Sequence, residues 1–502
     1  MSQPLVEAME KYLREGVYPL HTPGHKGGRG MGEPLASLLG EDSLRMDVSL
    51  MAELDDIHEP SGCIGAAQEK AAELYGADAC FFAVNGTTGA IQAMLMAALD
   101  PGDKVLVPRN AHRSVSSGLI LADAVPVYVW PEYLEEFSLQ GQITPAQVEE
   151  AFRNQPDLKA VLVTSPNYFG MTADLTAIGE IAHRHGALLL VDEAHGPHLG
   201  FTDRLPASAL KCGADLTAQS AHKLLGAMTQ CSWLLMREEN ISRERVADMM
   251  SLLTTTSPNY LLMGSLDSAR EQLALRGPSM MEDALAASDL LRKELARVPG
   301  LRVIGKADVT GRAGVTDLDT TKVTVNFRHV PGVSGIAAGE HLRRKGVAVE
   351  LVDPENLLFL VTYADWQPEW PALAASIRES LTELCGGESG GENREGGKPG
   401  AGNRGTGSAD AHSRPERPPV TEAVLPLRQV FYGRKASLPL EQAEGRICAE
   451  SVSFYPPGIP VILPGERITG DIIRFCRKMK AQGLPVSGPQ DPTLETVRVV
   501  AD

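Results

Sequence analysis

The sequence predicts an α/β fold with a mainly parallel sheet, accompanied by small α+β domains. Short and almost uninterrupted apolar runs recur in the first half of the chain, at 80–84, 104–108, 125–130, 159–164 and 187–193. Longer segments with helical periodicity separate them, such as 88–99 and 175–186. Apolar strands that alternate with helices form parallel sheets covered on both faces. Because crossovers are right-handed, the carboxyl ends of these strands share one edge, where open α/β sheets bind ligands.

Changes in composition divide the 502 residues into five segments, since this length exceeds one compact domain. The segment before the linker combines a long helical pattern with strands such as KVTVNF and LLFLVTY. The linker itself is rich in glycine and charge and has no large apolar residue, which predicts disorder. In chain order we expect an N-terminal arm at 1–60, a large domain at 61–265, a small α+β domain at 266–385, a disordered linker at 386–419 and a C-terminal domain at 420–502.

The composition indicates which partners and which cellular compartment to expect. The formal net charge of −17 argues against a nucleic-acid partner, which usually needs a basic face, and is compatible with a cationic substrate. Seven cysteines without a CxxC pair indicate a reducing compartment, so we expect a cytoplasmic protein. The N-terminus lacks the apolar region of a signal peptide, and no run of 18 apolar residues predicts a membrane span.

Two residues near the ends of apolar runs are candidates for covalent and electrostatic chemistry. Lys223 follows the run ADLTAQ, and an amine at this edge can form an imine with an aldehyde, although a surface lysine is the alternative. Asp192 ends the run LLLVD, and a buried carboxylate needs a strong partner such as a protonated pyridine nitrogen. A capping role for Asp192 is one alternative. A metal site with His195 and His198 is another, but HExxH is absent. The DEAH letters also occur in helicases, but no GxxxxGK[ST] loop accompanies them.

Two further segments could hold an anion and a planar ring. Thr87 and Thr88 lie in NGTTGA, where a strand enters a helix whose free N–H groups can bind a phosphate. His112 follows the run KVLVP and could stack on a cofactor ring, or be an ordinary loop histidine. Each segment is weak evidence alone. Because all of them follow apolar runs, we predict that they form one site for pyridoxal 5'-phosphate (PLP). We expect no metal ion in this site.

The motifs resemble those of the bacterial Orn/Lys/Arg decarboxylases, a family with the aspartate-aminotransferase-like fold, called fold-type I, of PLP enzymes. The resemblance covers nearly the whole chain outside the linker. The chain most resembles the short, biosynthetic members of the family, because the HTPGHK arm begins near the first residue. The motifs are HTPGHK, LDDIHEPSG, NGTTGA, NAHRS, SPNYFG, VDEAHG, SAHK, TTTSPNY, SLDSAR and PPGIPVILPGE.

The resemblance implies a role for each candidate residue. Lys223 carries PLP as a Schiff base, Asp192 pairs with the pyridinium nitrogen and His112 stacks on the ring. His195 lies near the phenolic oxygen of the cofactor. The phosphate is surrounded by Thr87, Thr88, Ser220 and His222, and by Thr256 and Ser257 from the neighbouring subunit of a homodimer or larger homo-oligomer.

The resemblance also implies decarboxylation of a basic amino acid, with arginine to agmatine favoured over lysine or ornithine. Lys223 or His222 returns the proton to Cα, and the sequence does not choose between them. We expect an acidic group to meet the distal cation, and Glu350 is the candidate; a solvated strand-end glutamate is the alternative. Two other functions stay open: another fold-type I activity such as an aminotransferase, and a PLP-binding regulatory protein without catalysis.

Overall fold

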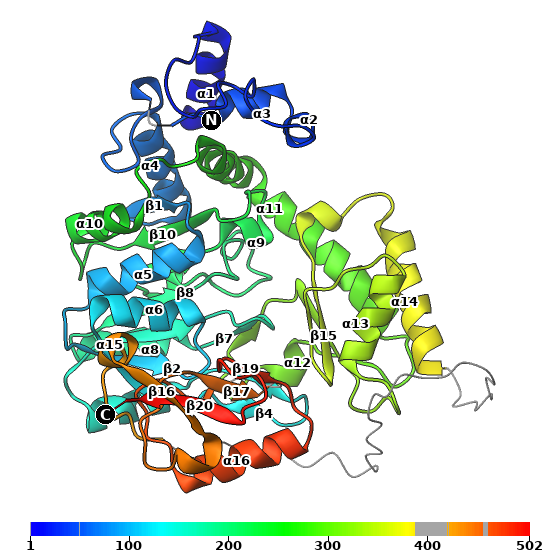
Figure 1. Cartoon of the computed structure of the whole chain (residues 1–502). Helices are drawn as coiled ribbons and strands as arrows, with labels where there is room; N and C mark the ends of the chain where they lie inside the picture. The colour runs from blue at the N-terminus through cyan, green and yellow to red at the C-terminus, as the bar shows by residue number, and fades with distance from the viewer. Residues whose placement is uncertain (1, 50, 387–418, 420, 455–459, 502) are drawn as a thin grey trace.

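The computed structural model describes residues 2–49, 51–386, 419, 421–454 and 460–501. A seven-stranded sheet forms the centre of the largest part of the molecule (Figure 1). The predicted linker at 386–419 lies almost entirely outside the described residues, as does part of the PPGIPVILPGE motif.

The central sheet is mainly parallel, as the apolar runs predict. Its strand order is β1-β10-β9-β8-β6-β2-β3, and only β10 runs antiparallel to its neighbours. Six strands lie within a residue or two of the predicted runs: β1 (Ala79–Ala83), β2 (Lys104–Pro108), β3 (Val125–Val129), β6 (Leu158–Thr164), β8 (Leu188–Asp192) and β9 (Leu216–Gln219). The seventh, β10 (Ser232–Met236), was not predicted from the sequence.

Helices cover both faces of the central sheet, which explains why most residues of its strands are apolar. Along β2, Val105 and Val107 pack into one hydrophobic cluster while Leu106 packs into the cluster on the other face. The first cluster is closed by α5 (Gly86–Ala98), α6 (Arg113–Ala122) and α10 (Arg243–Leu253). The second is closed by α7 (Pro145–Asn154) and α8 (Leu175–Arg184). A two-sided cover of this kind supplies most of the burial that stabilises the domain.

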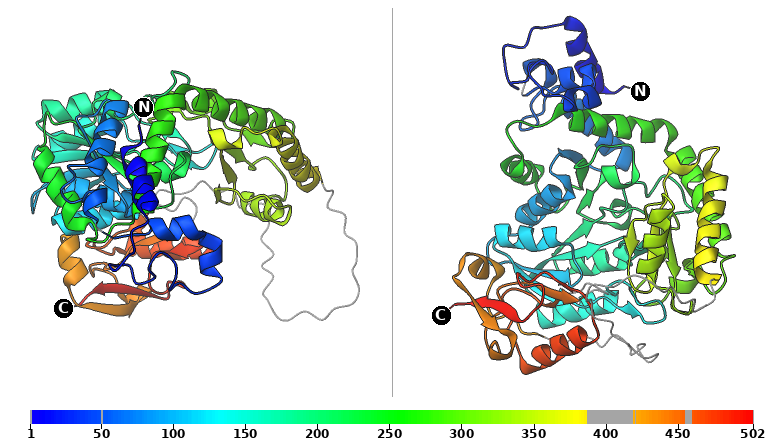
Figure 2. Two further views of the ribbon diagram at one scale, coloured as in Figure 1. Left: turned by 90° about the horizontal axis from the view of Figure 1, so that it is seen from above. Right: turned by 45° about the vertical axis from the view of Figure 1, so that its right-hand side comes forward.

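The N-terminal arm packs against a third cluster and then extends from the body of the molecule (Figures 1 and 2). Asp267 anchors it, because its carboxylate accepts a hydrogen bond from the Leu5 backbone N–H at 3.0 Å and pairs with Arg270. Arg270 in turn donates to the Ser2 carbonyl at 2.8 Å. The elements of this region are α1 (Pro4–Glu15), α2 (Leu35–Leu39), α3 (Glu41–Met46), a 3₁₀ turn at Ala52–Leu54 and α4 (Cys63–Tyr75).

The long helix predicted after residue 266 is α11 (Tyr260–Leu295), which runs without interruption through Pro278. Its C-terminal half packs on a four-stranded sheet of order β11-β13-β15-β14. This small α+β unit contains β11 (Arg302–Val303), α12 (Lys306–Val309), β13 (Lys322–Asn326), α13 (Gly335–Arg344), β14 (Leu351–Val352), β15 (Asn356–Leu360) and α14 (Trp370–Gly386). Two short pairs lie between it and the central sheet: β4 (Tyr133–Leu134) with β5 (Leu139–Gln140), and β7 (Met171–Thr172) with β12 (Asp317–Leu318).

The C-terminal part has its own hydrophobic cluster and packs beside α6 and β2 (Figure 1). A buried ion pair attaches it, in which Arg109 donates to Glu466 at 2.6 and 2.7 Å. Its elements are α15 (Leu427–Tyr432), β16 (Lys435–Pro439), β17 (Val452–Phe454), β18 (Pro460–Ile462), α16 (Gly470–Ala481), β19 (Val486–Ser487) and β20 (Thr496–Val500). Among the helices of the described residues, none is both long and apolar enough to cross a membrane.

Candidate active site

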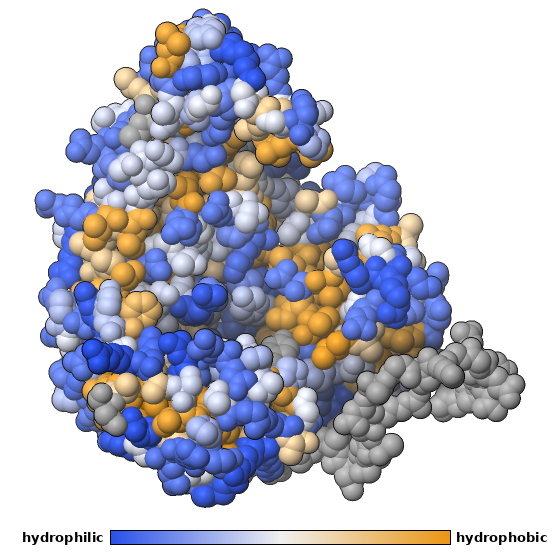
Figure 3. Space-filling view, in the orientation of Figure 1, coloured by the Kyte–Doolittle hydropathy of each residue, from blue (hydrophilic) through white to orange (hydrophobic). Residues whose placement is uncertain are grey.

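A cavity of about 720 Å³ lies at the carboxyl edge of the central sheet. The molecular surface is hollowed where the central sheet, the small sheet and the C-terminal part meet (Figure 3). Eight residues predicted from the sequence line the cavity: Thr87, Thr88, His112, Asp192, His195, Ser220, His222 and Lys223.

Strand register explains why residues so far apart in the sequence meet here. In the parallel ladder, Thr164 at the end of β6 lies opposite Asp192 at the end of β8, and Asp192 lies opposite Ala218 in β9. The chain then turns from β9 through Ser220 into the short helix α9 (Ala221–Leu224), which carries Lys223. The carboxyl ends of the adjacent strands β6, β8 and β9 therefore place Thr164, Asp192 and Lys223 at the same edge of the sheet.

The amine of Lys223 contacts His195, and Tyr168 packs beside both residues. Lys223 Nζ lies 3.0 Å from His195 Nε2, and the rings of Tyr168 and His195 are 4.6 Å apart. Burial lowers the pKa of Lys223, an effect that the carboxylate of Asp192 partly opposes. Burial and the charges of Lys322 and Lys223 lower the pKa of His195 well below its ordinary value. A neutral His195 can accept a hydrogen bond from the Lys223 amine.

Asp192 places a buried carboxylate in the cavity. The residue is 3% exposed, and its Oδ1 accepts a hydrogen bond from the Ala194 backbone N–H at 3.1 Å. Burial raises the pKa of Asp192, while the Ala194 N–H and the charges of Lys223 and His112 act in the opposite direction. A cation placed against this carboxylate would stabilise its ionised form.

Three hydroxyl groups gather at the start of α5. Thr87 Oγ1 contacts the hydroxyl of Ser220 and lies 2.8 Å from Ser232 Oγ. Gly86, at φ 67°, has the left-handed backbone that lets the chain turn from β1 into this helix. Thr88 is exposed toward the same cavity. Hydroxyl groups and the free N–H groups of a 13-residue helix form a site suited to a phosphate.

The two remaining histidines of the predicted set are held by specific contacts. His112 caps α6, and its Nδ1 accepts hydrogen bonds from the Ser114 backbone N–H at 3.3 Å and the Ser114 hydroxyl at 2.8 Å. His222 Nδ1 donates to the Cys231 carbonyl at 2.9 Å. Burial lowers the pKa of each histidine. Burial therefore disfavours the charged form of both rings, and each has one ring nitrogen engaged by the protein.

Three predicted residues do not line the cavity. Thr256 and Ser257 are exposed in the loop between α10 and α11. Glu350 is also exposed, and its backbone N–H donates to the Leu358 carbonyl at 3.1 Å. Its charge nevertheless opposes the lowering of the Lys223 pKa that burial produces.

The structure adds lining residues that the sequence analysis missed. Tyr168 lies in SPNYFG and could have been selected as an aromatic residue just after an apolar run. Asp353 follows a two-residue strand, and Ser453 and Ser487 come from the C-terminal part. No local pattern marks these three, because distant packing brings them to the cavity.

A buried charged cluster supports the wall of the site behind His195. Lys322 Nζ contacts Asp319 Oδ2 at 3.1 Å and the His195 carbonyl at 3.3 Å, and Asp319 also lies 3.1 Å from His198. Lys322 and its neighbours hold the pKa of Asp319 well below its usual range. Because Lys322 lies on β13, the cluster joins the small sheet to the loop that carries His195. Elsewhere, too, the described residues contain no cluster of three His, Cys, Asp or Glu side chains that could hold a metal ion.

The fold and the cavity define a class of protein: an α/β enzyme in which Lys223, the buried Asp192 and His112 meet at one edge of the sheet. Residues 3–369 match the family model "Orn/Lys/Arg decarboxylase, major domain" and residues 416–486 match "Orn/Lys/Arg decarboxylase, C-terminal domain". The chain belongs to the Orn/Lys/Arg decarboxylase family, whose members are PLP-dependent decarboxylases of basic amino acids.

Curated relatives and solved structures agree with this assignment. An arginine decarboxylase of Bacillus subtilis is 38% identical over 502 residues, covering 99% of this chain and 98% of the relative. The inducible lysine decarboxylase of Escherichia coli is 24% identical and covers 93% of this chain and 75% of the relative. The crystal structure of a Francisella novicida lysine decarboxylase shares the fold, with a TM-score of 0.80, 20% identity and coverage of 99% and 81%. The predicted fold class and family are confirmed.

Proposed function

We propose that this chain converts arginine to agmatine and carbon dioxide with PLP carried on Lys223. The observation that carries the proposal is the convergence of Lys223, Asp192 and His112 on one cavity in a chain of this family. Whole-length curated relatives named arginine decarboxylase are 36–38% identical, whereas the curated lysine decarboxylases are 24–26% identical. This difference supports arginine over lysine.

The residues of the cavity fit PLP. The buried Asp192 carboxylate suits a protonated pyridine nitrogen, since a cation offsets the cost of burying its charge. The hydroxyls of Thr87 and Ser220 at the start of α5 suit the phosphate, and His112 suits the face of the ring. When bound, PLP withdraws the electron pair left on Cα as carbon dioxide departs.

The residues of the chain have separate tasks in this reaction. The lowered pKa of Lys223 increases the fraction of its amine that is neutral and nucleophilic. His195, 3.0 Å away, keeps the amine in position and can take or return its proton. Lys223 is therefore our preferred donor of the proton to Cα, ahead of His222, whose Nδ1 is engaged by Cys231. Asp192 supplies the negative charge that would stabilise the protonated pyridine nitrogen of the cofactor.

Amine-product analysis tests the proposed substrate. Purified protein with PLP is incubated separately with arginine, lysine and ornithine, and the amine and carbon dioxide are quantified together. We expect agmatine as the main product. Cadaverine or putrescine as the main product would assign lysine or ornithine instead. A keto acid without carbon dioxide would indicate an aminotransferase, and PLP binding without turnover would indicate a regulatory protein.

We also propose a homodimer in which Thr256 and Ser257 complete the neighbouring site. Two observations support it: the two residues are exposed outside the cavity of their own chain, and the arm that follows α1 extends from the body with exposed apolar side chains, including Tyr18, Leu20 and Leu38. Mixing tests the idea. Chains carrying Lys223→Ala, mixed with chains carrying Thr256→Ala and Ser257→Ala, recover activity in a shared-site dimer, whereas an active monomer would refute it.

A cytoplasmic location and the five-domain division remain our proposals. All seven cysteines are free, which supports a reducing compartment. Separate hydrophobic clusters in the small sheet and in the C-terminal part support domain boundaries near those predicted. Limited proteolysis, with the cleaved bonds identified by mass spectrometry, tests the boundaries.

A further inference from the structure

Lys322 is a buried lysine of the small sheet that reaches the loop carrying His195. It is the first residue of β13 and is only 1% exposed. Its Nζ contacts the Asp319 carboxylate at 3.1 Å and donates to the His195 carbonyl at 3.3 Å. An apolar side chain of similar volume would fill this space without the cost of burying a charge, so stability alone is a weak reason for the pair. The position of Lys322 beside His195 indicates a role in the site.

Asp319 supplies the counter-charge of Lys322 and is itself fixed by several contacts. Its Oδ1 accepts the Thr321 backbone N–H at 3.0 Å and the Thr321 hydroxyl at 2.7 Å, and its Oδ2 lies 3.1 Å from His198 Nε2. The Asp319 backbone N–H donates to the Gly170 carbonyl at 2.8 Å. Gly170 has a φ of 86°, and a Cβ there would lie 2.7 Å from the Asp319 carbonyl oxygen. The turn that carries Asp319 therefore packs directly on the loop between β6 and β7.

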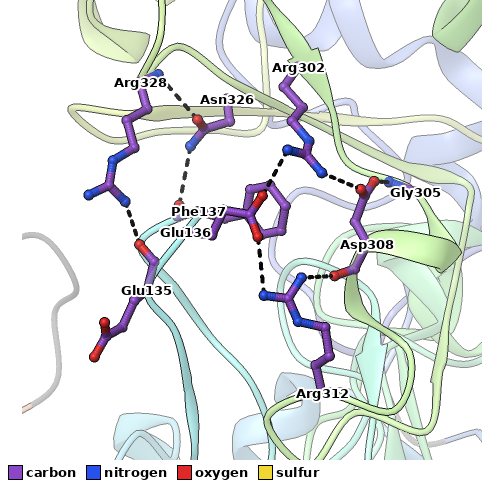
Figure 4. A network of polar contacts seen from close by, with 9 residues as sticks. All are labelled: Glu135, Glu136, Phe137, Arg302, Gly305, Asp308, Arg312, Asn326 and Arg328. Atoms are coloured by element: carbon purple, nitrogen blue, oxygen red, sulfur yellow. Dashed lines mark hydrogen bonds and ion pairs between the residues drawn. The ribbon is translucent and has the colours of Figure 1, made fainter.

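Strand β13 is anchored at both ends, which fixes the position of Lys322. At its start, Arg292 of α11 donates to the carbonyls of Thr320 at 3.1 Å and Lys322 at 2.7 Å. At its other end, the Asn326 side-chain amide donates to the Phe137 carbonyl at 3.2 Å, within a network that ties the loop between β4 and β5 to the small sheet (Figure 4). Ion pairs between arginine and glutamate side chains belong to the same network. A strand held in this way is a rigid support for groups that must be placed accurately.

The imidazole of His195 depends on its main chain for its position. Its Nε2 lies 3.0 Å from Lys223 Nζ, whereas its Nδ1 is buried without a hydrogen-bond partner among the described residues. The ring of Tyr168 packs beside it, with the ring centres 4.6 Å apart. Because no described residue holds Nδ1, the bond from Lys322 to the His195 carbonyl is the polar contact that fixes this part of the loop.

The charge of Lys322 acts on the same pair of groups. Burial lowers the pKa of Lys223, the Asp192 carboxylate opposes this effect, and the Lys322 ammonium adds to it. Burial and then the Lys322 ammonium also lower the pKa of His195. The charged and titratable groups that interact with the Lys223 amine are Lys322, His195, His112, His222, Asp192 and Glu350. Among them, Lys322 is a cation that burial and Asp319 hold in place from the small sheet.

We propose that Lys322 is a positioning residue for the reaction, which holds the His195 loop so that the imidazole meets the Lys223 amine. Its ammonium also favours the neutral form of that amine. The neutral form is the one that bonds to an aldehyde and that can exchange a proton with His195. The inference rests on the proposed function and deepens it by naming a residue outside the cavity lining that acts through His195 and Lys223.

Competitive acetylation measures the Lys223 amine without turnover. The full-length protein, with PLP removed, is treated with trace acetic anhydride at a series of pH values. Mass spectrometry then compares acetylation of Lys223 with that of Lys11, whose side chain is 75% exposed. Lys322→Met keeps most of the packing and removes the charge, so the pKa of Lys223 should rise. We expect its relative acetylation at pH 7 to fall by about 3- to 10-fold.

Two further variants separate the charge of Lys322 from a general loss of stability. Lys322→Met/Asp319→Asn removes both charges, leaves no uncompensated buried carboxylate and should show the same fall. Arg270→Met is the matched control and should leave the acetylation of Lys223 unchanged. Arg270 and Asp267 form a buried pair with the same three-residue spacing as Lys322 and Asp319, and their side chains are 2% and 0% exposed.

Turnover by the enzyme loaded with PLP completes the test. In Lys322→Met, kcat for arginine should fall by about 10- to 100-fold with a smaller change in KM, because a misplacement of about 1 Å can cost this much. Unchanged acetylation of Lys223 or unchanged kcat in a folded variant would overturn the inference, as would an equal fall of acetylation in Arg270→Met. If neither Lys322 variant folds, the wild type decides. A Lys223 that acetylates with a lower pH midpoint than Lys11 supports the inference, and an equal midpoint overturns it. By contrast, a wild type that releases no amine from any basic amino acid would refute the proposed function and leave the acetylation result standing.

Discussion

The ion pair between Arg109 and Glu466 provides a strong test of how the C-terminal part is attached. The two side chains are 3% and 2% exposed. The guanidinium makes two bonds to the carboxylate and also donates to the carbonyls of Pro460 at 2.9 Å and Val461 at 3.2 Å. Glu466→Gln leaves the buried guanidinium without a counter-charge. Removing one partner of a buried pair costs about 3 to 5 kcal/mol.

An exposed pair of the same length is the matched control. Arg204 and Glu282 also approach to 2.6 Å, but their side chains are 51% and 54% exposed. Glu282→Gln should therefore cost less than about 1 kcal/mol. If the C-terminal part unfolds as a separate unit of 60 to 100 residues, each kcal/mol lowers its midpoint by about 4 to 8 °C. Glu466→Gln should then lower that midpoint by more than about 10 °C.

Scanning calorimetry measures the midpoint, and limited proteolysis identifies which part unfolds first. The double variant Arg109→Met/Glu466→Met should recover most of the loss, because an apolar pair removes both buried charges. Activity should fall in Glu466→Gln as well, since Ser453 and Ser487 of the C-terminal part line the cavity. Equal effects of Glu466→Gln and Glu282→Gln would refute the reasoning.

Four shorter predictions concern the site, its pH dependence and the linker. Lys223→Ala should abolish both turnover and borohydride-dependent PLP labelling, and labelling that persists at another lysine would contradict the assignment. Asp192→Asn should retain cofactor but lower kcat by about 100-fold or more, whereas a near-normal kcat would exclude the pairing. Burial raises the pKa of Glu193 from 4.5 to about 7. Its protonated form therefore stabilises the fold most below pH 4.5, and this contribution is lost as the pH rises toward 7. Glu193→Gln should flatten that part of the stability curve, and an unchanged slope in urea unfolding would argue against this pKa. Replacing 387–418 by a short Gly/Ser linker should preserve activity, because doubling a loop length costs only about 0.6 kcal/mol, and loss of folded protein would show a structural role.

The sequence alone predicted the central sheet well because most of its strands are buried on both faces, the partly buried edge strand β3 being the exception. The run at 104–108 coincides with β2, and the other predicted runs differ from their strands by a residue or two. β10 was missed as a strand, although Ser232–Met236 is fully buried. Its antiparallel position between β1 and β9 depends on which edges the chain reaches, and that is a property of the whole topology.

Some residues of the candidate site could likewise be predicted from local sequence, and others could not. Lys223, Asp192 and His112 could be selected from the sequence because the ends of parallel strands share one edge, so local pattern implies spatial proximity. Asp353, Ser453 and Ser487 could not, because their positions depend on how the small sheet and the C-terminal part pack against the central sheet. The contact between Lys223 and His195 likewise depends on tertiary packing. Periodicity along a chain determines which faces are buried, whereas distances between separate elements are set only when those faces pack together.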